Sequence, residues 1–470
     1  MARAIPETRA SWSGQLAFVL AAAASAVGLG NLWRFPYLAA KYGGGVFIAV
    51  YLALSLTLGF ALLVTEIAIG RKSRQSQLTA FTALGHRRWA WVGWLSTLVP
   101  LLIAPYYAVI GGWVVRYFIR YLGLVCGYGG GAASAKAAFD GFLAAPNEPF
   151  AYMCVFIALT VAVLLVGVKR GIEKANVVLM PALLAMALFL AVWVAFQPGA
   201  GEGIRYYLVP DFSSCDNLGK VVLGAMGQMF FSLSLAMGIM VTYGSYMRRE
   251  DSIPRGAVRV VAADTFVAAL AGFMVIPMVH AFAVKNGFDV RQAMDAGPGL
   301  MFITLPEVFR TLGPAGDWIG LAFFSLVLFA ALTSAISMSE ACLAAVCDAT
   351  GIRRRGSALL VGAFCVVCGA FSAFSYGRLA SVKLMGLPIL DFIDAVVNSA
   401  IMPVTALGIC LFVGWALKPK GIVDEIELSG ERFRVASAYG FAMRYLVPIL
   451  IVAILVSEIC RTFGIGGWKI

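Results

Sequence analysis

Charged side chains are scarce in this sequence. Only 13% of its 470 residues are Asp, Glu, Lys or Arg, whereas about a quarter is usual in soluble globular domains. Histidine occurs only at His86 and His280, and no H-E-x-x-H motif is present. A G-x-x-x-x-G-K-[ST] nucleotide-binding loop is also absent. A membrane-bound enzyme and an ATP-driven pump are therefore disfavoured.

Cysteine pairs with regular spacing are also few. Nine cysteines are scattered along the chain, mostly within apolar runs. The Cys-x-x-Cys formed by Cys365 and Cys368 lies inside a predicted membrane span. We interpret this pair as thiols packed in the protein interior, which is a simpler explanation than a metal or redox site. The chain also has no N-x-S/T sequon, and so offers no acceptor for N-glycosylation.

Long apolar runs are what the sequence does contain. Apolar residues make up 61% of the chain, and about 20 such residues in a helix span a bilayer core. We predict an all-α membrane protein, a single transporter domain over residues 1–470 with eleven transmembrane helices. They are expected at residues 12–37, 44–70, 90–123, 150–168, 175–197, 217–246, 256–285, 317–348, 357–375, 388–416 and 438–463.

The net charge of +12 follows the predicted topology and does not suggest a nucleic-acid partner. With the N-terminus in the cytoplasm, the basic clusters fall on the cytoplasmic side, which is the positive-inside pattern. The odd number of spans then places Ile470 outside. Two loops, 127–149 and 289–310, are predicted to be structured, and 421–434 to be a charged cytoplasmic linker. The basic clusters are Arg71/Lys72/Arg74, Arg87/Arg88, Lys169/Arg170/Lys174, Arg248/Arg249/Arg255/Arg259, Arg353–Arg355 and Lys418/Lys420.

The first and sixth spans have unusual centres. The first reads Ala-Val-Gly-Leu-Gly-Asn at residues 26–31, and the sixth reads Ser-Leu-Ser-Leu-Ala-Met-Gly at 232–238. Interrupted helices at matching positions of two halves indicate an inverted repeat with its binding site at the breaks. We expect five-helix repeats at 12–197 and 217–416, followed by the helix at 438–463. Close helix packing through small residues is the alternative.

The backbone groups exposed at the two helix breaks determine which ligands could bind at these breaks. One end exposes N–H groups and suits a carboxylate, while the other exposes C=O groups and suits a cation or an ammonium group. A zwitterionic amino acid fits both ends, and Na⁺ as a hard cation wants oxygen ligands. Ionisable residues within membrane spans are functional candidates, although structural ion pairs or helix-end anchors are the alternative. The oxygen candidates are Asn31, Ser232, Asp264, Thr333 and Ser334, and the ionisable ones are Arg34, Glu66, Asp264, Glu340, Asp391 and Asp394.

Several motifs resemble the neurotransmitter:sodium symporter family, and the short loops resemble its prokaryotic branch. The resemblance runs in order over essentially the whole chain. It implies a LeuT-type fold and sodium-coupled import of a small, hydrophobic or aromatic amino acid by alternating access. It also implies a bacterial inner-membrane location among lipids, with no obligate protein partner. The motifs are Ser11-Trp12, the segment 26–36 (AVGLGNLWRFP), Gly43-Gly-Gly, 66–71 (EIAIGR), 227–235 (GQMFFSLSL), 297–306 (GPGLMFITLP) and 330–334 (AALTS).

The resemblance implies two sodium sites. The family often has Thr where this chain has Ser232 and Gly where it has Ala24, and both changes keep the required oxygen. Chloride-dependent relatives have a neutral Asn at the position of Asp264, so the resemblance implies no chloride requirement here. The first site would use Ala26, Asn31, Ser232, Asp264 and the substrate carboxylate; the second would use backbone oxygens of Ala24, Val27 and Ala330 with the hydroxyls of Thr333 and Ser334.

The resemblance also implies a substrate pose. The carboxylate would meet N–H groups near Leu29 and Gly30 and the hydroxyl of Tyr107, and the amine would meet carbonyls near Ala26, Phe231 and Ser232. Monoamine carriers have Asp at the position of Gly28, so this chain should prefer carboxylate-bearing substrates. The side-chain pocket would comprise Ile103, Phe231, Ser234, Met237, Ser337 and Met338.

Gating residues follow from the same resemblance. Arg34 with Asp391 would form an outer gate above Tyr107 and Phe231, and Glu66 would satisfy the broken backbone. Gly171 and Pro181 match a G-x9-P pattern whose cytoplasmic helix end unwinds to release sodium. The inner gate would comprise Arg9, Trp12, Ser245, Tyr246 and Asp348.

A sensor without transport, or a channel, is the alternative that saturable sodium-dependent uptake would exclude.

Overall fold

The computed structural model describes residues 9–128, 134–210, 212, 217–287, 294 and 297–463, with side chains as far as Ser457. The predicted outer end at Ile470 and parts of both predicted loops lie outside the described residues. In the first half the helices are α1 (Gln15–Ala26), η1 (Gly30–Arg34), α2 (Phe35–Lys41), α3 (Gly45–Leu54), η2 (Ser55–Gly59), α4 (Phe60–Ser73), α5 (Gln77–Ala83), η3 (Arg87–Trp89), α6 (Ala90–Val125), α7 (Ala135–Ala144), α8 (Glu148–Val166), η4 (Val168–Glu173), α9 (Lys174–Ala195) and α10 (Ala200–Leu208).

The second half is also almost entirely helical. Its short hairpin pairs β1 (Lys383–Leu384) with β2 (Leu387–Pro388) in antiparallel register. The helices are α11 (Leu218–Ser232), α12 (Ile239–Ser245), α13 (Ile253–Asn286), η6 (Leu300–Thr304), α15 (Leu305–Thr311), α16 (Pro314–Thr350), α17 (Arg354–Ala373), α18 (Ile389–Val396), η7 (Val397–Ile401), α19 (Met402–Leu411), η8 (Phe412–Ala416), α20 (Lys418–Glu427), α21 (Ala436–Phe441), η9 (Ala442–Leu446) and α22 (Val447–Phe463).

The membrane spans agree with the predicted pattern. In the described part of the chain, nine continuous helices are long and apolar enough to cross a membrane. Another crossing is the pair Gln15–Ala26 and Gly30–Lys41, which is bent by 54°. Helices α11 and α12, separated by residues 233–238, form a second interrupted pair at the position of the predicted sixth span.

Local backbone geometry explains both interruptions. After α1, Val27 has an extended conformation with ψ of 101°, and the Gly28 amide donates to the Asn31 side chain at 3.0 Å. After α11, Ser234, Ala236 and Gly238 all have positive φ values of 52°, 61° and 68°. A helix cannot continue through such residues, because positive φ lies outside the right-handed helical region. Both spans therefore expose backbone groups at mid-depth.

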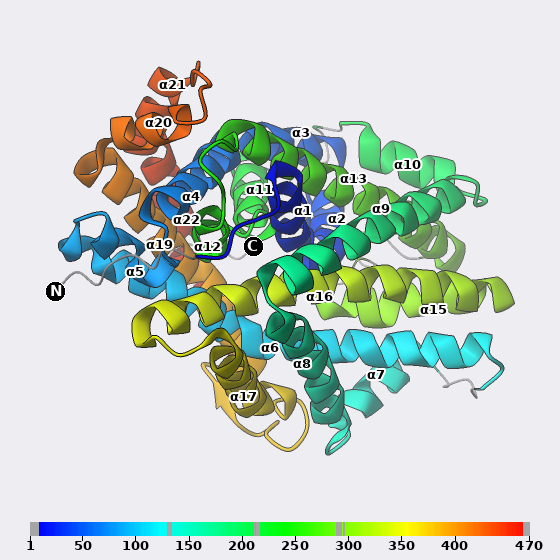
Figure 1. Ribbon diagram of the computed structural model, residues 1–470. Helices are drawn as coiled ribbons and strands as arrows, with labels where there is room; N and C mark the ends of the chain where they lie inside the picture. Colours follow the sequence, from blue (N-terminus) through cyan, green and yellow to red (C-terminus); the bar gives the residue numbers. More distant parts are fainter. Residues whose placement is uncertain are drawn as a thin grey trace.

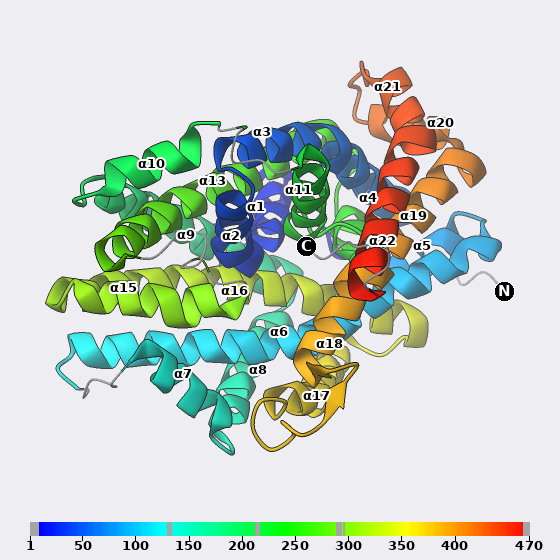
Figure 2. The same cartoon turned by 180° about the vertical axis from the view of Figure 1, so that it is seen from behind.

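The long helices form two packing groups around these breaks. Helices α1, α4, α12 and α13 pack against one another, and α6, α8, α16 and α17 form the other group. Figures 1 and 2 show α6 and α16 running side by side, with α1 near the centre of the molecule. Helix α16 also contacts α1 and α12. The breaks thus lie where the two groups meet.

The segments between spans contain helices that the sequence did not specify individually. Helix α7 lies in the first predicted loop, and η6 and α15 lie in the second. The predicted linker 421–434 is partly helical, because α20 extends to Glu427. Helix α20 is held by Arg71, whose buried Nε donates to Glu425 Oε1 at 2.8 Å. That linker is therefore docked on the end of α4 and is not a free tether.

Candidate functional site

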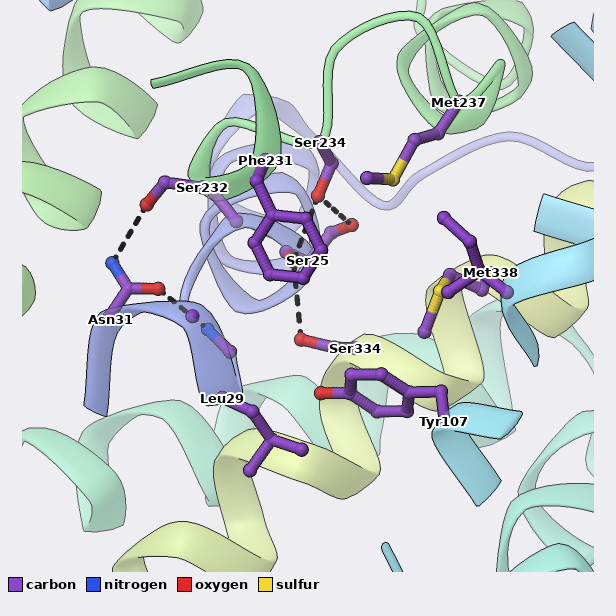
Figure 3. Close-up of a pocket in the computed structure, with 14 residues that line it drawn as sticks. Ser25, Leu29, Asn31, Tyr107, Phe231, Ser232, Ser234, Met237, Ser334 and Met338 are labelled. Atoms are coloured by element: carbon purple, nitrogen blue, oxygen red, sulfur yellow. Dashed lines mark hydrogen bonds between the residues drawn. The ribbon is translucent and has the colours of Figure 1, made fainter. Parts of the chain in front are cut away.

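A cavity lies between the two helix breaks (Figure 3). Its empty space, including the part open to solvent, is about 370 Å³. Met237 and Met338 lie on one side of the Phe231 ring, and the Tyr107 hydroxyl turns toward Ser334. The lining residues are Ser25, Ala26, Gly28, Leu29, Gly30, Asn31, Ile103, Tyr107, Phe231, Ser232, Ser234, Met237, Ser334 and Met338.

The cavity contains every predicted substrate residue except Ser337. The Ser337 hydroxyl donates to the Thr333 carbonyl at 2.9 Å and accepts a bond from the Tyr243 hydroxyl at 2.8 Å. It is therefore occupied by protein partners behind the cavity wall. The family resemblance implied a pocket role for Ser337, but its hydroxyl bonds Tyr243 of the separate helix α12.

The first oxygen cluster surrounds the buried carboxylate of Asp264. Its Oδ1 accepts bonds from Asn31 Nδ2 and Ser232 Oγ, each at 2.8 Å. Its Oδ2 accepts a bond from the Tyr51 hydroxyl, also at 2.8 Å. These partners are neutral, and among the described residues no Lys or Arg forms a salt bridge with Asp264. A buried carboxylate of this kind favours a bound cation, because an uncompensated buried charge is costly.

Tyr51 is a member of this cluster that sequence reasoning missed. It lies in α3, is fully buried, and is 213 residues from Asp264 in sequence. Its ring also makes an edge contact with Phe35 at a centroid distance of 5.1 Å. The only sequence signal was a tyrosine inside an apolar span, and such tyrosines usually find a buried partner for the hydroxyl.

The second oxygen cluster joins α16 to the end of α1. The Ser334 hydroxyl donates to the carbonyls of Ser25 at 3.2 Å and Val27 at 3.3 Å. The Thr333 hydroxyl donates to the Ala330 carbonyl at 3.1 Å. Four of the five predicted second-site residues are therefore engaged in two adjacent bonds. Ala24, the fifth, is buried one residue before Ser25.

Ser25 is a second residue that sequence reasoning missed. Its carbonyl accepts bonds from both the Ser234 hydroxyl at 3.1 Å and the Ser334 hydroxyl. Ser25 thereby links the first break, the second break and α16. Ser25 is one of many small residues in the Ala-rich stretch of α1, so the composition of this stretch does not indicate that its carbonyl has a special role.

Glu66 reaches the second break from α4. Its Oε1 accepts a bond from the backbone N–H of Ala236 at 2.6 Å, so a carboxylate satisfies an amide that the break releases. At the first break the Gln228 side chain donates to the Gly30 carbonyl at 3.1 Å. Each break is thus stabilised by a side chain from another helix, as backbone at this depth requires.

On one side of the cavity, Arg34 lies above the Phe231 ring, with 5.5 Å between its Cζ and the ring centroid. The Asp391 carboxylate accepts a bond from the Tyr376 hydroxyl at 2.8 Å. Among the salt bridges of the described residues there is none between Arg34 and Asp391. Asp394, one turn along, accepts a bond from the Tyr106 hydroxyl at 2.8 Å.

On the opposite side, which we call the N-terminal face, the predicted inner-gate residues are in contact. Arg9 Nη1 lies 3.0 Å from both oxygens of Asp348, and Arg9 Nε donates to Ser245 Oγ at 2.9 Å. The Trp12 indole donates to the Tyr243 carbonyl at 3.0 Å, and the Trp12 amide donates to that of Tyr246 at 3.1 Å. This face is closed by direct contacts from the N-terminal segment.

Three further predicted positions, one ionisable residue and the two residues of the G-x9-P pattern, are also described by the structure. Glu340 forms a salt bridge with Arg354 at 2.6 Å and accepts a bond from the Tyr246 hydroxyl. Gly171 lies in the π-helical turn η4, where a side chain would meet the Val163 carbonyl oxygen. Pro181 lies inside α9. The fifth span is helical through both hinge positions in this structure.

Comparison with known proteins identifies the family to which this protein belongs. The model of the sodium:neurotransmitter symporter family matches residues 9–127 and 143–465. The chain belongs to this symporter family. It is therefore a multi-pass membrane protein and a sodium-dependent transporter of a small molecule, and not an enzyme.

Individual members of the symporter family match over their whole length. The sodium-dependent transporter YhdH of Bacillus subtilis is 34% identical over 453 residues, covering 95% of this chain and 97% of the relative. The sodium-dependent transporter MJ1319 of Methanocaldococcus jannaschii is 31% identical, covering 98% and 93%. The crystal structure of MhsT in complex with L-phenylalanine superposes with a TM-score of 0.85 at 34% identity, covering 96% of this chain and 100% of MhsT. The predicted LeuT-type fold is confirmed.

Proposed function

We propose that this symporter imports hydrophobic or aromatic amino acids together with sodium, by alternating access across the bacterial inner membrane. The observation that carries the proposal is the cavity between two broken helices, flanked by two oxygen clusters. Its side walls are Met, Ile and Phe surfaces, and no Lys, Arg, Asp or Glu lines it among the described residues. The similar MhsT was crystallised with L-phenylalanine, which fits such a lining.

The substrate backbone would lie along the first break. Leu29 and Gly30, at the start of η1, line the cavity together with Tyr107, and their N–H groups and the Tyr107 hydroxyl would receive the carboxylate. The carbonyl ends of α1 and α11 would take the amine. The Phe231 ring and the two methionines would contact the apolar side chain, and Met adapts to varied shapes.

Two sodium ions would occupy the oxygen clusters. At the first, the Asp264 carboxylate supplies charge and Ser232 and Ala26 supply oxygens, while the Asn31 amide must turn over to present its oxygen. At the second, Thr333 and Ser334 would exchange their bonds to backbone carbonyls for bonds to the ion, together with Ala24, Val27 and Ala330. One charge moved across 100 mV is worth about 2.3 kcal/mol, so two ions would drive strong accumulation.

Gating would use contacts on both faces. We assign the N-terminal face to the cytoplasm, where Arg9, Trp12, Ser245, Tyr246 and Asp348 close the pathway. Arg34 would close the outer side over Phe231, with Asp391 and Asp394 as the acidic groups opposite it. Glu66 would hold the second break in shape. Unwinding between Gly171 and Pro181 would open the route for sodium release.

The proposed activity predicts a specific uptake profile. In proteoliposomes with an inward sodium gradient, the purified protein should accumulate L-phenylalanine, L-tryptophan or L-leucine without ATP. Each should compete with the others, whereas lysine and glutamate should not, because the cavity has no charge to compensate theirs. Uptake that persists when the sodium gradient is collapsed, or stronger competition by lysine or glutamate, would contradict the proposal.

A second prediction concerns backbone space at the first break. Gly30→Ala should weaken apparent substrate affinity by at least about tenfold, since a Cβ there would lie 2.6 Å from the Phe231 ring and would push that ring into the cavity. The measurement is substrate-concentration dependence of uptake at saturating sodium. Gly201→Ala, at a helical site with nothing within 4 Å of the new Cβ, is the matched control. Wild-type affinity in Gly30→Ala would exclude this pose.

A further inference from the structure

A buried glutamine connects the second helix break to the opposite packing group. Gln77 is the first residue of α5 and is fully buried. Its Nε2 donates to the Ala341 carbonyl of α16 at 3.1 Å. Its Oε1 accepts a bond from the Thr242 hydroxyl of α12 at 2.5 Å. A single amide therefore uses its donor on one helix and its acceptor on another.

These two bonds connect Gln77 to helices of the two different packing groups. Helix α5 packs most extensively against α6 and also contacts α16, α4 and α12, whereas α12 packs mainly against α4. The bond from Gln77 to Ala341 thus stays within the group of α6 and α16. The bond from Thr242 to Gln77 crosses to the group of α1, α4, α12 and α13. It must break if α12 moves away from α5 and the α16 carbonyl that Gln77 also binds.

Packing around Gln77 ties it to the break itself. Gly238 ends the break with a φ of 68°, and a Cβ there would lie 2.8 Å from the Cβ and Cδ of Gln77. Glycine is thus needed for the glutamine to sit against the turn. Next to it, the Ser76 amide donates to Asp348 Oδ2 at 2.6 Å. The start of α5 therefore contacts both the break and the Arg9–Asp348 pair.

We infer that Gln77 is a positioning residue that holds the cytoplasmic side of this transporter closed by bonding Thr242 across the two packing groups. The inference rests on the proposed alternating access. A buried amide that loses a hydrogen-bond partner is left unsatisfied, which destabilises that state unless a water molecule replaces the partner. The crossing bond therefore favours the state in which α12 lies against α16. Removing it should shift the population toward a cytoplasm-open state.

The test measures opening without requiring transport. Hydrogen–deuterium exchange of full-length protein should show α12 amides of Thr242→Val exchanging roughly three- to tenfold faster than wild type in sodium, the range that one net hydrogen bond supplies. Gln77→Met, which keeps the side-chain length, should do the same, and the double variant should add little to Gln77→Met. Thr405→Val is the matched control, because that buried threonine bonds only its own helix at Ile401.

Uptake kinetics give the second reading. Thr242→Val should raise the sodium concentration for half-maximal uptake with a smaller change in substrate affinity at saturating sodium, which a general loss of packing would not produce. Wild-type exchange in both Thr242→Val and Gln77→Met would overturn the inference. If Gln77→Met does not insert, Thr242→Val decides the result alone. Absence of sodium-dependent uptake in the wild type would instead overturn the proposed function, and the exchange result would still stand.

Discussion

Asp264→Asn should raise the sodium concentration needed for half-maximal uptake by at least about tenfold, and wild-type uptake should be unchanged when gluconate replaces chloride. The carboxylate is fully buried and accepts three bonds from neutral donors, Asn31, Ser232 and Tyr51. A carboxylate binds a hard cation more strongly than an amide does, because charge adds to coordination. It also supplies a fixed negative charge, so no anion is needed beside the ion.

The measurement is uptake against sodium concentration at fixed ionic strength, for wild type and Asp264→Asn, in chloride and in gluconate. Asp140→Asn is a suitable control, since that carboxylate is 55% exposed and pairs only with Lys136 on its own helix. Unchanged sodium dependence in Asp264→Asn would show that this carboxylate is not a ligand. Collapse of wild-type uptake in gluconate would show that it does not replace chloride.

Loss of the Arg9–Asp348 pair should reduce uptake at least about tenfold while leaving membrane insertion intact. Both side chains are largely buried, at 13% and 15% exposure, and the pair is bidentate at 3.0 Å. Removing one partner leaves a poorly solvated charge on the other, which costs far more than loss of a surface pair. In Arg9→Ala that charge is Asp348, which keeps only the Ser76 amide as a hydrogen-bond donor among the described residues. The closed state is thereby destabilised.

The initial uptake rate, normalised to the amount of protein in the membrane, tests this expectation. The matched control is Asp140→Ala, which removes an exposed pair of similar length, 3.1 Å, and should leave uptake within twofold. Wild-type uptake by both Arg9→Ala and Asp348→Ala would show that this ion pair is not part of the gate. A loss of uptake in Asp140→Ala equal to theirs would indicate a general effect of charge removal.

The spans and the breaks follow from local sequence. Apolar runs of about 20 residues can satisfy their backbone in lipid only as helices, so the eleven spans were predictable within a few residues. Small and polar residues at 26–31 and 232–238 indicated two interrupted helices with a binding site at the breaks, and the cavity lies there. The family motifs then indicated most of its lining, including Tyr107, Phe231 and Met338.

Other features required the tertiary structure, because they depend on side chains that meet across hundreds of residues. Nothing near Tyr51 in sequence indicates that its hydroxyl reaches Asp264, and nothing near Gln77 indicates bonds to both Thr242 and Ala341. The family resemblance placed Ser337 in the pocket, yet its hydroxyl bonds Tyr243 and it does not line the cavity. Sequence periodicity determines which face of a helix is buried, but the choice of hydrogen-bond partner is made by the packing of separate helices, to within tenths of an ångström.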